Sequence, residues 1–394
     1  MLALRLMRGG RPYVQIRRLL VSVASAGTGF LLLCALGHAL QGGPGRGVRL
    51  AWCLVPLVAT VYVAVAVART DPALRPDRSG LAAFGLEGAG LRVFTGVATA
   101  AFCGLGSVVA LIAFLFARGN LVGRPLGDGT AKALGATATY ALPLAGVITL
   151  LAVVPVVASV AATFAAPVGA RGRRAEDGRT PKAPAPPATP PAGLPWGVAL
   201  LTAGIAVQTY AGRGAERRGT AWLDGTGSSL AGVLTGWALA ALGLAVAGPG
   251  LTYLCGRALQ SARPGAVRLL AGRGLQEEAR RIGRPAGVVC AVAAALLSAV
   301  RLGGTVPSRQ GDAAPGLLTL FGVTLVAACA GAALLLAAVE SRQARHETTA
   351  TLQRAGAPAA TLRAAVAMRA GALLVMLAPL AWLVAVLTTL PLVG

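Results

Sequence analysis

The sequence predicts an all-α fold, a polytopic transmembrane helical bundle of about nine spans. Nine stretches of the 394-residue chain contain no Asp, Glu, Lys or Arg, and 56% of all residues are hydrophobic. These stretches are continuous apolar runs rich in Ala, Leu, Val and Gly, whereas a membrane β-barrel needs short segments of alternating polarity. A helical membrane protein is therefore expected.

The nine apolar stretches follow one another along the whole chain, with charged segments between them. Most of them supply the roughly 20 residues that a helix needs to cross a bilayer at about 1.5 Å per residue. The fourth stretch is longer than one span, and its membrane part is predicted at Leu142–Ala166. The stretches lie within residues 19–40, 50–68, 93–117, 133–170, 183–212, 225–256, 285–300, 313–339 and 370–394.

The charges are strongly basic and unevenly placed. The chain has 36 Lys and Arg against 13 Asp and Glu, for a net charge of +23. With the N-terminus inside, one side of the membrane receives 26 of the basic residues and the other receives 10. Because cytoplasmic loops of membrane proteins are enriched in Lys and Arg, this division predicts a cytoplasmic N-terminus and an external C-terminus in the cell membrane. Anionic lipids of the cytoplasmic leaflet attract such basic loops, so the lipid bilayer accounts for the net positive charge and no nucleic acid partner is expected. The predicted cytoplasmic segments are 1–18, 69–96, 167–195, 256–285 and 340–369.

A Pro-rich linker divides the chain. Residues 171–195 begin with charged side chains and continue as a Pro/Ala tract, which is extended and packs no core. Segments 1–18 and 267–284 are each basic, partly apolar and placed directly before a span, as expected of helices lying in the membrane interface. The two halves of the chain thus resemble each other at these two segments.

A second internal repeat is found directly after the second span and again after the eighth. Residues 78–92 and 345–363 each run from an Arg through a helical stretch to a Gly-Ala break and then to Leu-Arg before the next span. Internal repeats of this kind are usual in transporters.

The pattern R-x-E-x-x-A-x-L-x-x-x-G-A at Arg345–Ala357 resembles the cytoplasmic segment of FtsX/MacB-like ABC transporter permeases. The resemblance implies two permease-type repeats, at 1–170 and 256–394, joined by the linker 171–195 and by two connecting spans in 196–255. In two respects the chain departs from the family. The loops 41–49 and 305–315 are too short for the large external domain that many members carry, and the second repeat ends at Gly394 where the family's normally continues with a further span.

The resemblance also implies partners and a site. The partners are a cytoplasmic ABC ATPase subunit and a second permease copy or paralogue, and the substrate is amphipathic, such as a peptide, an antibiotic or a lipid. ATP would bind to the partner, so no cofactor is expected in this chain. A short helix that ends in Gly would project into a groove of the ATPase. The candidate coupling residues are Arg345, Glu347, Leu352, Arg354, Gly356, Arg363, Arg78, Leu86, Glu87, Gly88 and Arg92.

No enzyme is predicted from the residues. The only phosphate-loop candidate, Gly127–Lys132, lacks the Gly-Lys-Ser/Thr sequence. No catalytic, cofactor-binding or metal-binding set is visible, and the chain has only two histidines. A secondary transporter or channel-like protein with an internal repeat stays open as an alternative, as does a non-transporting regulator linked to an ATPase.

Overall fold

Nine long helices make up almost all of the part of the chain that the computed structural model describes. Eight of them are long and apolar enough to cross a membrane, and α4 (Leu54–Thr70) is a shorter apolar helix of 17 residues. The predicted polytopic helical bundle is confirmed, and the chain is a multi-pass membrane protein. The described residues are 12–40, 52–70, 89–119, 143–165, 193–217, 227–261, 265–305, 317–345, 350–351, 353–354, 356 and 358–393.

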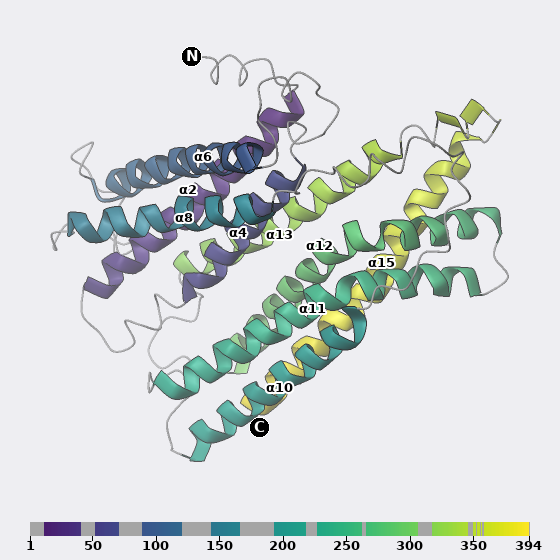
Figure 1. The fold of residues 1–394 in the computed structure, drawn as a ribbon. Coiled ribbons are helices and arrows are strands. Elements are labelled where there is room, and N and C mark those ends of the chain that lie inside the picture. Colours follow the sequence, from purple (N-terminus) through teal and green to yellow (C-terminus); the bar gives the residue numbers. More distant parts are fainter. Residues whose placement is uncertain are drawn as a thin grey trace. The chain divides into compact units, whose positions relative to one another are not determined.

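The chain forms two compact units (Figure 1). The first comprises residues 1–181 and 314–332, and the second comprises 182–313 and 333–394. The division along the chain falls within the predicted linker, of which residues 171–192 lie outside the described part. Helix α13 (Leu317–Ala344) contributes its first half to the first unit and its second half to the second unit. The boundaries of the permease-type repeats stay a prediction.

The first unit packs α2 (Pro12–Leu40), α4, α6 (Ala89–Ala117) and α8 (Leu144–Ala165). Helix α8 agrees with the span predicted at 142–166. Hydroxyl groups link these helices inside their apolar surfaces. The Thr28 and Thr60 hydroxyl oxygens lie 2.6 Å apart between α2 and α4, and Ser25 Oγ donates to the Cys103 carbonyl at 2.9 Å between α2 and α6. Such bonds stabilise helix contacts where lipid offers no partner.

The second unit packs α10 (Gly193–Arg217), α11 (Gly227–Ser261), α12 (Ala266–Thr305) and α15 (Ala359–Val393). Helices α10 and α11 approach each other closely because glycine faces glycine. A Cβ atom built on Gly204 would lie 2.6 Å from the Gly236 carbonyl oxygen, and one on Gly236 would lie 2.7 Å from the Gly204 carbonyl oxygen. Helices α11 and α12 meet in the same way at Gly256 and Gly272. Small residues at these positions let the backbones touch.

The segment 267–284 differs from its expectation as an interface helix. It forms the first half of α12, which continues as one helix of 40 residues, or about 60 Å, through Pro285 into the span. The physical reason is the contact between Gly256 of α11 and Gly272 of α12, which holds the charged first half of α12 against α11. Helix α11 likewise extends past the start of α10. Gly197, near the start of α10, packs against Ala247, so the last 14 residues of α11 lie beyond this contact.

The membrane orientation gives a first testable prediction. In a version of the chain without its native cysteines, Ala185→Cys is expected to resist an impermeant thiol reagent in intact cells and to react after lysis. Gly394→Cys is expected to react in intact cells. The reason is the division of basic residues, 26 on the cytoplasmic side and 10 on the other. Labelling of Ala185→Cys in intact cells, or of Gly394→Cys only after lysis, would contradict the nine-span orientation.

Candidate coupling site in the second unit

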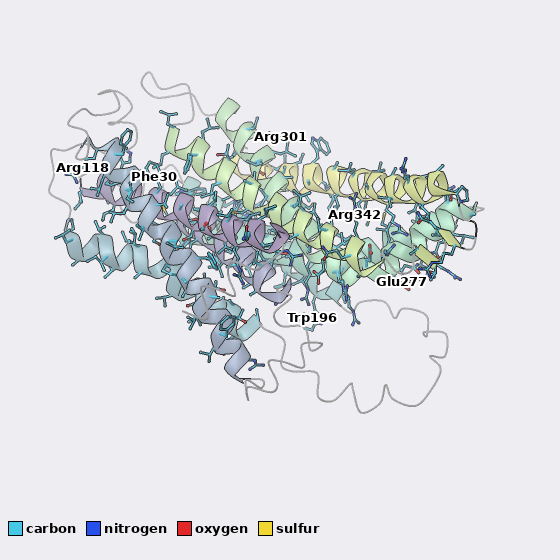
Figure 2. All side chains as sticks on the ribbon, turned by 90° about the horizontal axis from the view of Figure 1, so that it is seen from above. Phe30, Arg118, Trp196, Glu277, Arg301 and Arg342 are labelled. Carbon is cyan, nitrogen blue, oxygen red and sulfur yellow. The ribbon has the colours of Figure 1, made fainter. Side chains whose placement is uncertain are left out.

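Several described charged residues of the second unit meet near the end of the α11–α12 hairpin, where α13 finishes and α15 begins. In Figure 2, Glu277 of α12 and Arg342 of α13 lie toward this end, away from Arg301 near the other end of α12. Trp196, in the first turn of α10, is 73% exposed. Exposed tryptophans favour the membrane–water interface, so the hairpin end that continues beyond α10 is expected to lie outside the hydrocarbon. We call this region, residues 251–280 with 341–369, the polar end.

An ion pair joins the end of α13 to α12. The Arg345 guanidinium contacts the Glu278 carboxylate, and its Nη2 donates to the Gly274 carbonyl oxygen at 2.7 Å. The side chains are only 22% and 12% exposed, respectively. Removing one partner of such a shielded pair leaves an uncompensated charge, which destabilises far more than the loss of an exposed pair. The pair therefore holds Arg345 in place.

A second arginine reaches the same helix from α15. Arg369 Nη2 donates to the Leu270 carbonyl oxygen at 2.9 Å. The Arg369 guanidinium also lies directly over Gly274, where an added Cβ would collide with it and would come within 2.7 Å of Arg345 Nη1. Two guanidinium groups from different helices thus meet above one glycine of α12.

The sequence-predicted coupling residues of the second half are partly described. Arg345 lies in the ion pair, whereas Arg354 and Arg363 are exposed. Gly356 adopts a φ of +90°, and its N–H donates to the Gln353 carbonyl at 3.0 Å. This is the left-handed conformation with which glycine ends a helix. Glu347 and Leu352 lie outside the described residues.

The copy of this repeat in the first half, residues 78–92, is the weaker match, and the structure describes only its end. Arg78, Leu86, Glu87 and Gly88 lie outside the described residues, and Arg92 is half-buried near the start of α6. The structure thus brings Arg345 together with α12, and it does not bring the other predicted residues into one cluster within the part that it describes.

Sequence reasoning missed Gly274, Glu278 and Arg369. A signal was present, because Glu277 and Glu278 are two of only 13 acidic residues and stand in a segment rich in Arg. An acid in such a setting indicates a basic partner. Which of the many arginines is that partner depends on the packing of α12, α13 and α15, and 71 residues separate Gly274 from Arg345.

Within the described ranges, no group of three His, Cys, Asp or Glu side chains is placed to hold a metal ion. The polar end offers cationic side chains, backbone carbonyl groups and the shielded ion pair between Arg345 and Glu278. This chemistry suits contact with another protein or with anionic groups. Comparison with known proteins finds no family model, no curated protein and no solved structure that matches this chain.

Proposed function

We propose that this chain is the permease subunit of an ABC-type transporter in the cell membrane. A separate cytoplasmic ATPase supplies the energy, and two permease copies or paralogues form the transporter. The substrate is an amphipathic molecule such as a peptide, an antibiotic or a lipid, which is exported or extracted from the bilayer. The observation that carries the proposal is the segment 345–363, in which the sequence Arg-x-Glu is followed, between two membrane helices, by a helix end at Gly356 with its φ of +90°.

The apolar spans support energy input through a protein contact. Ion-driven transporters generally hold acidic, basic or histidine side chains within the membrane. The nine apolar stretches of this chain contain no Asp, Glu, Lys or Arg, and His38 is the only histidine among them. The coupling energy is therefore expected to enter at a cytoplasmic surface.

The polar end offers such a surface. Exposed arginines from α12 and from the segment around Gly356 border it, and the ion pair between Arg345 and Glu278 holds the start of the segment. Leu352 would add the apolar contact. An exposed helix with one apolar residue and flanking charges fits a groove, in which burial provides affinity and charge determines register.

The proposal predicts that an ATPase co-purifies with the affinity-tagged chain from its native membrane in mild detergent. The chain purified alone is expected to hydrolyse no ATP, because its sequence holds no phosphate-binding loop. Phosphate release is measured for the chain alone and for the complex, with a Walker-lysine variant of the ATPase as the control for contaminating activity.

Two outcomes would contradict the proposal. ATP turnover by the chain alone, unchanged through repeated purification, would make it an enzyme. A chain that transports in vesicles with an ion gradient and without any ATPase would be a secondary transporter, the alternative stated above.

A further inference from the structure

The chain before the candidate coupling segment and the helix after it both contact one face of α12. The segment begins after Arg345, at the end of α13, and leads into α15, which carries Arg369. Their bonding partners on α12 are Leu270, Gly274 and Glu278. These three residues are four positions apart, so they lie one above the other on the same helix face.

Gly274 is the centre of this arrangement. Its missing side chain lets Arg345 approach the helix backbone and leaves room for the Arg369 guanidinium above the same turn. Any other residue would place a Cβ against both groups. The opposite face of this half of α12 is occupied by α11, because Gly272 packs against the Gly256 carbonyl oxygen. The polar half of α12 is thus held between α11 and the two arginines.

We propose that Gly274, Glu278, Arg345 and Arg369 form a latch that makes α12 move together with the coupling segment. The inference rests on the proposed function and deepens it, because it names the span that receives the movement of the ATPase. These four residues are positioning residues, since none of them needs to contact the ATPase. A movement of the end of α13 would reach α12 through Arg345, and a movement of α15 would reach it through Arg369.

The test variant is Gly274→Ala, with Gly265→Ala as its matched control. Gly265 stands directly before the same helix, and a Cβ there would meet no atom within 4 Å. The probes are the co-purifying ATPase and ATP, with the complex in lipid vesicles. Gly274→Ala is expected to bind the ATPase as the parent does, while permease-stimulated ATP turnover falls toward the turnover of the ATPase without the permease. Gly265→Ala is expected to keep both the ATPase binding and the stimulated ATP turnover of the parent.

A second variant tests the contact itself. Arg369→Gln leaves α12 unchanged and removes one guanidinium, so it is expected to lower stimulated turnover. The double variant with Gly274→Ala is expected to lose little more than Gly274→Ala alone, because both changes break the same contact. Arg369→Lys keeps the charge and is expected to restore part of the turnover.

The permease alone provides a readout without the ATPase. Deuterium exchange at the amides of residues 266–274 is expected to be faster in Arg369→Gln than in the unaltered chain, because the bond from α15 to the Leu270 carbonyl is lost. Equal exchange, or stimulated turnover in Gly274→Ala equal to that of Gly265→Ala, overturns the latch. If the unaltered chain binds no ATPase, the proposed function fails before any variant is made, and the exchange experiment still decides whether the latch exists.

Discussion

Leu352→Asp is expected to weaken binding of the ATPase by about 10- to 150-fold, which corresponds to the roughly 1.5–3 kcal/mol gained when a leucine is buried. The reason is its place in a short polar segment that ends at Gly356, where one leucine supplies the apolar contact. The measurement is a detergent pull-down titration of the co-purifying ATPase at matched expression. Membrane insertion is expected to be normal, because the residue lies outside the apolar stretches.

The matched control is Gln353→Asp. Gln353 is the next residue and is exposed, so this change adds the same charge to the same segment without removing the leucine. It is expected to bind the ATPase nearly as the parent does. Glu347→Ala should weaken binding modestly, since exposed ion pairs contribute little. Leu86→Asp, in the weaker repeat copy at residues 78–92, should have a smaller effect than Leu352→Asp. Undiminished binding by Leu352→Asp would return segment 345–363 to an ordinary connecting loop.

Gly236→Ala is expected to destabilise the second unit by on the order of 3 kcal/mol, the upper part of the usual range for overpacking. The added Cβ would lie 2.7 Å from the Gly204 carbonyl oxygen and 2.5 Å from Gln208 Cγ. Gln208 is fully buried, and the backbone oxygen moves only if α10 and α11 separate. The measurement is the thermal unfolding midpoint in detergent, followed by intrinsic tryptophan fluorescence and by size-exclusion chromatography.

Two comparisons make this result specific. Gly371→Ala in α15 is the control, because no atom lies within 4 Å of the added Cβ. Its midpoint is expected to be no lower than that of the parent, because alanine is the better helix former. Gly204→Ala acts on the same contact as Gly236→Ala, so the double variant should lose less than the sum of the single changes. A midpoint unchanged by Gly236→Ala would mean that α10 and α11 do not touch through these glycines.

The membrane character and the positions of the helices could be predicted from the sequence, because both depend on local composition. A helix satisfies its own backbone hydrogen bonds, so a continuous apolar run of sufficient length is enough to predict a span. The predicted span at 142–166 and the observed α8 at Leu144–Ala165 illustrate this agreement. The helix break at Gly356 was equally local, since glycine alone adopts a φ of +90° without strain.

Only the tertiary structure decided which helices pack together and what Arg345 contacts. All spans are similarly apolar, so hydropathy does not distinguish one neighbour from another, and close packing is determined by where small residues face each other. Gly274 looks like any of the 53 glycines in the sequence. Its importance arises because α13 and α15 bring two arginines, 71 and 95 positions further along the chain, onto the same turn of α12. Contacts of such long range depend on the arrangement of whole helices, and no local pattern encodes them.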